Sequence, residues 1–250
     1  MCDDKKVAVI TGASSGIGRE TAIGLSSKGW NLILSGRRQE ALEETVRLCP
    51  GPVPSFVVGN ITDEEYVKSL FETVKGVYGR LDLVFNNAGV NAPAVPMEEL
   101  SLSNFQDVIN VNVTGAFLCT REAIKIFKAQ TPQGGRIINN GSISAHTPRP
   151  NSVAYTVSKH AITGLTKSTA LDGRPFNISC TQIDIGNAQT HMTARMEAGV
   201  LQPNGETRPE ALMEVKHVVD AIIYLADLPN SVTVLNMSIL ATGMPFVGRG

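Results

Sequence analysis

The chain has 250 residues, of which 42% are hydrophobic and 18% are charged, enough apolar material for a buried core and enough charge for a water-exposed surface. Its 22 basic and 23 acidic residues leave a formal net charge of −1, which creates no overall positive field for nucleic acid or anionic lipid. We therefore expect no nucleic-acid partner and no membrane partner.

The first residues, the cysteines and the histidines show no targeting, membrane-spanning or metal-binding pattern. Residues 2–6 are mostly polar and pass directly into an apolar run, without the three regions of a secretory signal. No apolar stretch approaches the roughly 18 residues that span a bilayer. The four cysteines are far apart and the four histidines form no H-E-x-x-H arrangement, so we expect free thiols and no metal site. These features favour a cytoplasmic enzyme.

Short, mostly β-branched apolar runs alternate along the chain with longer segments of helical periodicity. The predicted strands are 7–10, 32–34, 56–58, 81–85, 137–138, 178–183 and 232–240. The predicted helices are 16–28, 39–49, 63–78, 103–129, 152–171 and 214–226. This alternation predicts an α/β fold, doubly wound, with a mainly parallel seven-stranded sheet and helices on both faces. In such a sheet, ligands bind at the carboxyl ends of the strands.

The segment 187–209 is the long stretch that lacks clean periodicity. It follows a predicted strand and contains Gly199, Pro203, Gly205 and Pro209. Long irregular segments beside strand ends often cover a site, so we predict a substrate lid here.

The first predicted strand runs into Thr-Gly-Ala-Ser-Ser-Gly-Ile-Gly at residues 11–18, and a helix follows. Glycines in such a loop let the backbone turn tightly and let a pyrophosphate approach the helix N-terminus. Three glycines can also form a plain tight turn, but their position at the first strand–helix junction favours dinucleotide binding.

Further motifs follow in order along the chain. They are N-N-A-G at residues 86–89, Asn112 in a long predicted helix, Ser142, and Y-x-x-x-K at 155–159, with the serine 13 residues before the tyrosine. Any one of these can occur by chance. Together with the glycine loop they resemble the short-chain dehydrogenase/reductase family.

The resemblance extends from residue 5 to about residue 240. It implies a single NAD(P)-binding Rossmann-type domain over residues 1–250. It also implies hydride transfer between a nicotinamide cofactor and a small-molecule ketone or aldehyde, or the corresponding secondary alcohol, as in carbonyl reductases and alcohol dehydrogenases. Members of the family usually form dimers or tetramers, so a homodimer or homotetramer is expected.

The spacing of Tyr155 and Lys159 has a physical reason, because residues i and i+4 share one helix face. An ammonium group beside a phenol favours the phenolate, which suits the tyrosine to acid–base chemistry. The resemblance implies that Tyr155 exchanges the proton of the substrate oxygen, that Lys159 also binds the nicotinamide ribose, and that Ser142 stabilises the oxygen's charge. It implies that Asn112 holds a water that links the lysine to solvent.

Each of these residues also has a plainer interpretation. Ser142 could be a turn residue and Asn112 a polar residue that bends its helix. Tyr155 and Lys159 could form an amphipathic face whose lysine reaches water. Their joint occurrence at the family's spacing favours catalysis.

The residues after the second predicted strand bear on the choice of cofactor. Gly36 stands where NAD-preferring folds carry an acidic residue, and Arg37, with Arg38, could pair with a 2′-phosphate. These arginines favour NADP(H), although they could simply begin a solvated helix, and use of NAD(H) stays open. The residues expected to contact the cofactor are Gly12, Ser14, Ser15, Gly16, Ile17, Gly18, Arg37, Arg38, Asn60, Ile61, Asn87, Ala88, Gly89, Tyr155, Lys159, Gly186, Ala188 and Thr190.

Several positions depart from the family pattern. Asn60 replaces the usual aspartate at the adenine, and Ser15 stands where many NADP-preferring relatives have a basic residue. Ile185 precedes Gly186 in place of proline, and residues 241–245 lack the usual aspartate–glycine–glycine ending. The last departure leaves the role of the C-terminal tail open.

Two other functions compete with carbonyl reduction. One is a non-catalytic dinucleotide-binding sensor, which the intact catalytic set disfavours. The other is cofactor-assisted epimerisation or dehydration, for which the family's branches are usually longer. His146 and Arg149 could touch a polar substrate or could simply occupy a surface loop.

Overall fold

The computed structural model describes residues 5–190, 193 and 199–247. Its main sheet has seven strands in the order β3-β2-β1-β4-β5-β6-β9, and every pairing in it is parallel. The predicted doubly wound α/β fold is confirmed. The strands are β1 (Val7–Thr11), β2 (Asn31–Gly36), β3 (Ser55–Val58), β4 (Leu83–Asn86), β5 (Gly135–Asn140), β6 (Ile178–Ile185) and β9 (Asn236–Ile239).

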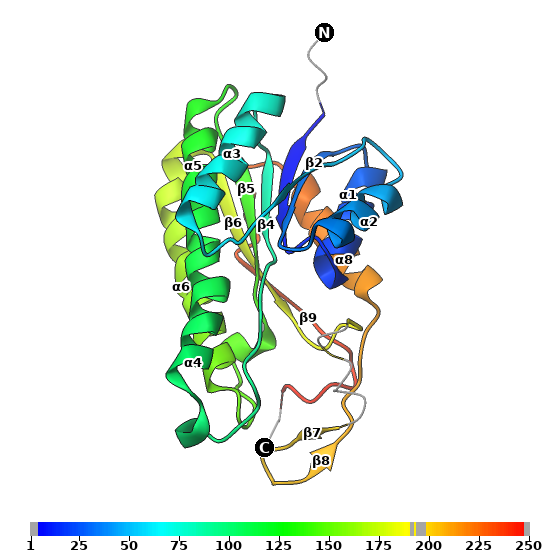
Figure 1. Cartoon of the computed structure of the whole chain (residues 1–250), viewed down its shortest axis with the longest axis vertical. Helices are drawn as coiled ribbons and strands as arrows, with labels where there is room; N and C mark the ends of the chain where they lie inside the picture. Colours follow the sequence, from blue (N-terminus) through cyan, green and yellow to red (C-terminus); the bar gives the residue numbers. More distant parts are fainter. Residues whose placement is uncertain (1–4, 191–192, 194–198, 248–250) are drawn as a thin grey trace.

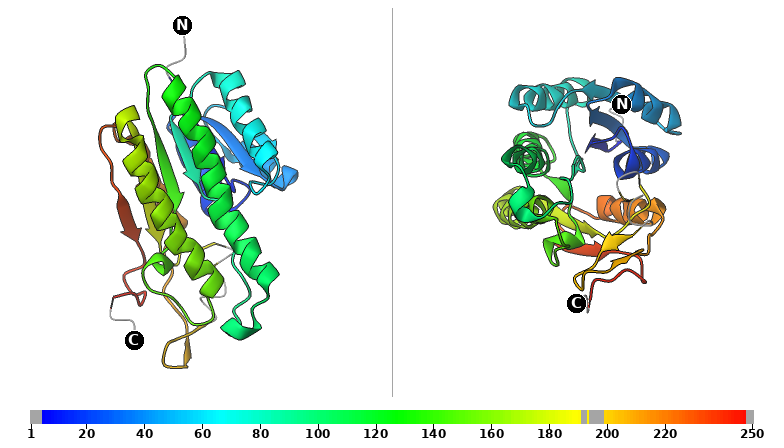
Figure 2. Two further views of the ribbon diagram at one scale, coloured as in Figure 1. Left: turned by 90° about the vertical axis from the view of Figure 1, so that its left-hand side faces the viewer. Right: turned by 60° about the horizontal axis from the view of Figure 1, so that its bottom comes forward.

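Helices cover both faces of the sheet (Figure 1). Helices α1 (Gly16–Ser27), α2 (Gln39–Leu48) and α8 (Val215–Asp227) lie on one face. On the other face lie α3 (Glu64–Tyr78), α4 (Leu102–Ile109), α5 (Ala116–Ala129) and α6 (Val153–Gly173), as Figure 2 also shows. This double cover buries the inner strands β1, β2, β4, β5 and β6, whereas the edge strands β3 and β9 stay partly exposed. Burial on both sides explains the nearly continuous apolar runs of β1, β2 and β4.

The core is correspondingly split into two layers. Along β1, Ala8 and Ile10 pack into the cluster beneath α1, α2 and α8, whereas Val7 and Val9 pack into the cluster beneath α3 and α5. All four side chains are at most 1% exposed. The period-two alternation of a strand thus distributes one short apolar run between both cores.

The predicted helix 103–129 is interrupted. Between α4 and α5, residues Asn110–Gly115 form a π-helical segment, a feature that is frequent at functional sites. Sequence periodicity does not show such a segment because it adds only a single residue to the winding.

The last strand is shorter than the predicted 232–240. The buried guanidinium of Arg136, on β5, donates to the carbonyl oxygens of Leu228, Pro229 and Val232 at 3.0–3.2 Å. These bonds hold the chain around the arginine in a loop before β9 begins at Asn236. Arg136 and Val232 are 96 residues apart in the sequence. A local sequence pattern therefore could not show that the arginine would end the strand early.

The predicted lid, 187–209, is only partly within the described residues, because 191–192 and 194–198 fall outside them. In the described part, Ala188 forms a parallel bridge with Met213. Strands β7 (Val200–Leu201) and β8 (Thr207–Arg208) pair as an antiparallel hairpin, which the sequence analysis did not predict. No helix in the described part of the chain is long and apolar enough to cross a membrane.

Cys49, Cys119 and Cys180 are free thiols, as predicted, and Cys2 lies outside the described residues. Burial raises the pKa of the Cys119 and Cys180 thiols to about 12. The thiolate is the reactive form, so both side chains should be inert in the folded protein.

We expect iodoacetamide at neutral pH to leave Cys119 and Cys180 unmodified in the native protein and to modify both after denaturation. Peptide mass spectrometry of the two samples measures this. Rapid modification of either thiol in the native protein would show that its surroundings open readily.

Candidate active site

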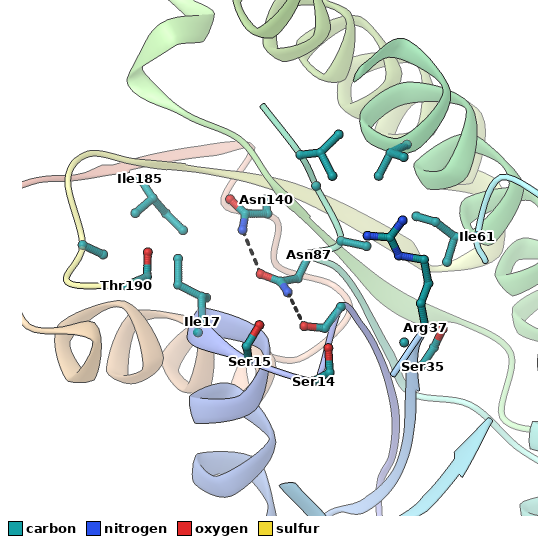
Figure 3. A pocket seen from close by; sticks show the side chains of 18 of the residues that line it. Ser14, Ser15, Ile17, Ser35, Arg37, Ile61, Asn87, Asn140, Ile185 and Thr190 are labelled. Carbon is teal, nitrogen blue, oxygen red and sulfur yellow. Dashed lines mark hydrogen bonds between the residues drawn. The ribbon is translucent and has the colours of Figure 1, made fainter. Parts of the chain in front are cut away.

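A pocket of about 330 Å³ lies where the chain leaves the carboxyl ends of β1, β2, β4, β5 and β6 (Figure 3). The strand order reverses between β1 and β4, and ligands bind at this point in doubly wound sheets. The pocket is lined by Gly12, Ser14, Ser15, Gly16, Ile17, Ser35, Gly36, Arg37, Arg38, Gly59, Asn60, Ile61, Asn87, Ala88, Gly89, Val90, Val111, Asn140, Gly141, Tyr155, Lys159, Ile185, Gly186, Ala188, Thr190 and Thr193. All the predicted cofactor residues except Gly18 are therefore brought together.

The glycine loop between β1 and α1 forms one wall. Gly12 has φ +65°, and a Cβ there would lie 2.9 Å from the Cα of Ala88. A Cβ on Gly18 would lie 2.4 Å from the carbonyl oxygen of Gly12. Gly18 does not line the pocket but allows helix and loop to pack closely, and its predicted contact with the cofactor stays a prediction.

The N-terminus of α1 faces the pocket without a side-chain cap. Ser15 is the residue before the helix, and its side chain caps none of the first backbone N–H groups. By contrast, the Asp63 side chain accepts from two backbone N–H groups at the start of α3. Uncapped N–H groups and the positive end of the helix dipole suit a phosphate, so the residues present fit a dinucleotide.

A line of hydrogen bonds joins the glycine loop to Lys159. The Asn87 side chain donates to the carbonyl oxygen of Thr11 at 2.9 Å. The Asn140 side chain donates to Asn87 Oδ1 at 2.9 Å (Figure 3). The Lys159 ammonium in turn donates to the Asn140 carbonyl oxygen at 2.7 Å. Asn140 is not among the residues predicted from the sequence, where its only signal is a polar residue at the end of a short apolar run.

The two arginines that directly follow β2 both line the pocket. The Arg37 side chain points into the pocket beside Ile61 (Figure 3). Arg38 donates to the hydroxyl oxygens of Ser15 at 3.1 Å and Ser14 at 3.3 Å. This bonding ties Arg38 to the glycine loop, while both arginines are exposed residues.

Tyr155 and Lys159 lie on one face of α6 and both line the pocket. Lys159 Nζ is 5.3 Å from the Tyr155 ring centroid, and the lysine is 6% exposed. Within the described residues, no hydrogen bond engages the Tyr155 hydroxyl, which leaves it available to a ligand.

Ser142 and Asn112 stand beside the pocket rather than in its lining. Ser142 follows the lining residue Gly141, is 6% exposed, and its Oγ accepts from the Ser144 backbone at 3.1 Å. The Asn112 side chain lies in the π-helical segment and bonds both the N–H of Val90, at 2.8 Å, and its carbonyl oxygen, at 3.0 Å. It thereby fixes the loop after β4.

Arg149 lies in the loop between β5 and α6 and pairs with the buried Glu210 at 2.5 Å. Asn187, at the start of the predicted lid, donates to Glu210 at 2.8 Å and accepts from Arg149 at 3.0 Å. These bonds join the loop that carries Ser142 to the segment after β6. Arg149 is thus a structural link rather than a free surface residue.

Within residues 5–190, 193 and 199–247 there is no cluster of three or more His, Cys, Asp or Glu side chains suited to a metal ion.

Comparison with known proteins decides the family. The protein-family model described as short chain dehydrogenase matches residues 6–200 of this chain. The chain belongs to the short-chain dehydrogenase family. The resemblance inferred from the sequence motifs is therefore confirmed, and the match includes the glycine loop, Asn112, Ser142, Tyr155 and Lys159.

Two relatives of this chain are named as dehydrogenases of hydroxylated ring compounds. A 3β-hydroxysteroid dehydrogenase from Mediterraneibacter gnavus is 34% identical over 204 residues, which cover 79% of this chain and 71% of the relative. A cis-4-hydroxycyclohexanecarboxylate dehydrogenase from Sinomonas cyclohexanicum is 31% identical over 225 residues, with 89% of each chain covered.

A solved short-chain dehydrogenase structure extends the likeness to the whole fold. A single-residue variant of actinorhodin polyketide ketoreductase, solved with NADPH, superposes with a TM-score of 0.83 at 25% identity. The alignment covers 95% of this chain and 96% of that one. The oxidoreductase family and the fold thus agree.

Proposed function

We propose that this short-chain dehydrogenase is an NADP(H)-dependent oxidoreductase that interconverts a ketone or aldehyde and the corresponding alcohol. The observation that carries the proposal is that one pocket is lined by the glycine loop with its uncapped helix N-terminus and also by Tyr155 and Lys159. A nicotinamide cofactor bound there would supply or accept the hydride.

Tyr155 is the proton donor for the carbonyl oxygen in reduction and removes that proton in oxidation. Its free hydroxyl and the ammonium of Lys159 beneath its ring support this role. The lysine, held by the Asn140 carbonyl, also binds the ribose hydroxyls of the cofactor. Ser142 donates a hydrogen bond to the substrate oxygen, and Asn112 holds the water that connects Lys159 to solvent.

The preference for NADP(H) rests on charge. Gly36 removes a carboxylate that would repel the 2′-phosphate, and Arg37 reaches into the pocket close to the same strand end. Arg38 already donates hydrogen bonds to Ser14 and Ser15, so Arg37 contributes most of the preference for NADP(H).

For the substrate, we infer a secondary alcohol on a saturated ring, or the corresponding cyclic ketone. The two relatives named for such alcohols support this class. The test measures NADPH consumption with cyclic ketones against open-chain ketones and aldehydes of equal carbon number. Higher kcat/KM for the cyclic set supports the substrate class, and no turnover with any of these carbonyls contradicts the proposed function.

The cofactor preference yields a prediction of its own. A charge-assisted hydrogen bond from Arg37 is worth about 1.5–3 kcal/mol, so wild type should favour NADPH over NADH by roughly ten- to a hundredfold in kcat/KM. Gly36→Asp combined with Arg37→Ala should reverse this preference. A Cβ on Gly36 would lie 3.3 Å from Leu42 Cδ2 and 3.5 Å from Ser14 Cβ, so the aspartate requires a shift of a few tenths of an ångström by Leu42, and the melting temperature of the double variant should be recorded beside its activity.

Arg47→Ala is the matched control, because this arginine of α2 is exposed and pairs with Glu44 away from the pocket. It should leave the preference unchanged. If wild type prefers NADH, or if the double variant keeps the wild-type ratio, Arg37 does not select the cofactor.

The cytoplasmic location, the single-domain organisation over 1–250 and the homodimer or homotetramer stay predictions. Gel filtration with light scattering would measure the assembly.

A further inference from the structure

A buried carboxylate lies directly behind Ser142. Asp184 is near the end of β6, and its side chain is 0% exposed. Its Oδ1 accepts from the backbone N–H of Ser142 at 2.9 Å and from the Gln182 amide at 2.7 Å. Its Oδ2 accepts from the Asn236 amide at 2.6 Å. The side chain is thus fixed from β6 and β9 as well as from the serine loop.

His146 completes this set of partners. Its Nε2 lies 2.7 Å from Asp184 Oδ2, the distance of a hydrogen bond in which an imidazole N–H donates to a carboxylate oxygen. Ser142 and His146 flank the single 3₁₀ turn Ile143–Ala145. One carboxylate therefore holds both ends of the turn that begins with the proposed catalytic serine.

The surroundings are shaped around this carboxylate. A Cβ on Gly141 would lie 2.2 Å from Asp184 Oδ1, so only glycine fits before the serine. The C-terminal tail adds Phe246, whose ring lies 6.3 Å from that of His146 in an edge-on contact. Neither Asp184 nor His146 is among the residues that line the pocket, and each is bonded to the turn that carries Ser142 or to its partner carboxylate.

We propose that Asp184 and His146 are positioning residues that fix Ser142 Oγ for proton and hydride transfer, an inference that rests on the proposed function. Asp184 holds the start of the turn through the Ser142 N–H, and His146 holds the end of the turn through its bond to the same carboxylate. Displacing a catalytic group by about 1 Å can cost roughly a hundredfold in rate, so this restraint has a measurable effect.

The first test does not depend on activity. His146→Leu removes the hydrogen bond and keeps an apolar side chain against Phe246, whereas His146→Gln keeps an N–H at a similar reach. By hydrogen exchange with mass spectrometry, peptides that cover 141–147 should exchange faster in His146→Leu than in wild type. His146→Gln should restore slow exchange, and peptides of β1 and α1 should be unchanged.

The second test is a double-mutant cycle. We expect His146→Leu to lower kcat roughly ten- to a hundredfold, with the KM for NADPH unchanged and His146→Gln close to wild type. In a Ser142→Ala background, the same His146→Leu change should cost less than about twofold, because the group that it positions is absent. Asp184→Asn should lower kcat at least as far, and if that variant does not fold, the His146 variants decide.

An undiminished His146→Leu loss in the Ser142→Ala background would show that His146 acts on the substrate directly and would overturn the proposal. Unchanged exchange of 141–147 in His146→Leu would also overturn it. A third outcome separates the two proposals. If residues 141–147 exchange faster in His146→Leu but the wild-type protein reduces none of the carbonyls, the proposed function is contradicted and the role of His146 in holding the turn stands.

Discussion

Tyr155→Phe should essentially abolish turnover, with kcat lowered by roughly 10²–10⁴-fold, the usual contribution of general acid–base catalysis. The change deletes only the hydroxyl that exchanges the proton, and the ring keeps its position above Lys159. The Kd for NADPH, measured by fluorescence titration, should therefore stay within about twofold of wild type.

Tyr224→Phe is the control for this substitution, because Tyr224 is 54% exposed on α8, away from the pocket. It should keep full activity. Substantial reductase activity in Tyr155→Phe would mean that another group delivers the proton and would remove the tyrosine from the mechanism.

Ser142→Ala should lower kcat by roughly 10²–10³-fold, the cost of removing one donor to a developing oxyanion. The KM for the carbonyl substrate should change much less, because the bond strengthens mainly in the transition state. The variant also loses the hydrogen bond from the Ser144 backbone N–H to Ser142 Oγ. Its melting temperature should therefore be measured to check that the enzyme is folded under the assay conditions.

Ser144→Ala is the matched control, since Ser144 is 7% exposed against 6% for Ser142 and lies in the same turn. It should retain kcat within a few-fold of wild type. Equal losses in the two variants would assign the effect to the turn as a whole, and full activity in Ser142→Ala would return this serine to a structural role.

The sequence predicted the fold well because its signals are local. Most strands of the sheet contain a short apolar run, and the crossover helices repeat their apolar residues at helical spacing. The glycine loop and Tyr155–Lys159 were also readable, since both motifs are contiguous and their spacing matches one turn or one helix face. The π-helical segment at Asn110–Gly115 escaped because it leaves the surrounding periodicity almost intact.

What the sequence could not show depends on partners far along the chain. Asp184 reads as a polar residue within an apolar strand, and its importance appears only when Ser142, 42 residues earlier, is placed against it. Asn140 gains its role from Asn87, 53 residues away. Arg136 shortens the last strand through carbonyl groups that no motif connects to it. Gly18 shows the converse case, in which a motif residue supports the packing of the loop instead of lining the pocket.

Hydride transfer from the cofactor to the substrate carbon is the central claim, and isotope transfer measures it most directly. NADPH that carries deuterium in the transferable position would be incubated with the protein and the preferred cyclic ketone, and the alcohol analysed by mass spectrometry and NMR. We predict one deuterium on the former carbonyl carbon, with none on oxygen after exchange into ordinary water, and labelled alcohol formed at least roughly a hundredfold more slowly by Tyr155→Phe. Alcohol formed without deuterium on that carbon, or no alcohol with any carbonyl tested, would contradict the account.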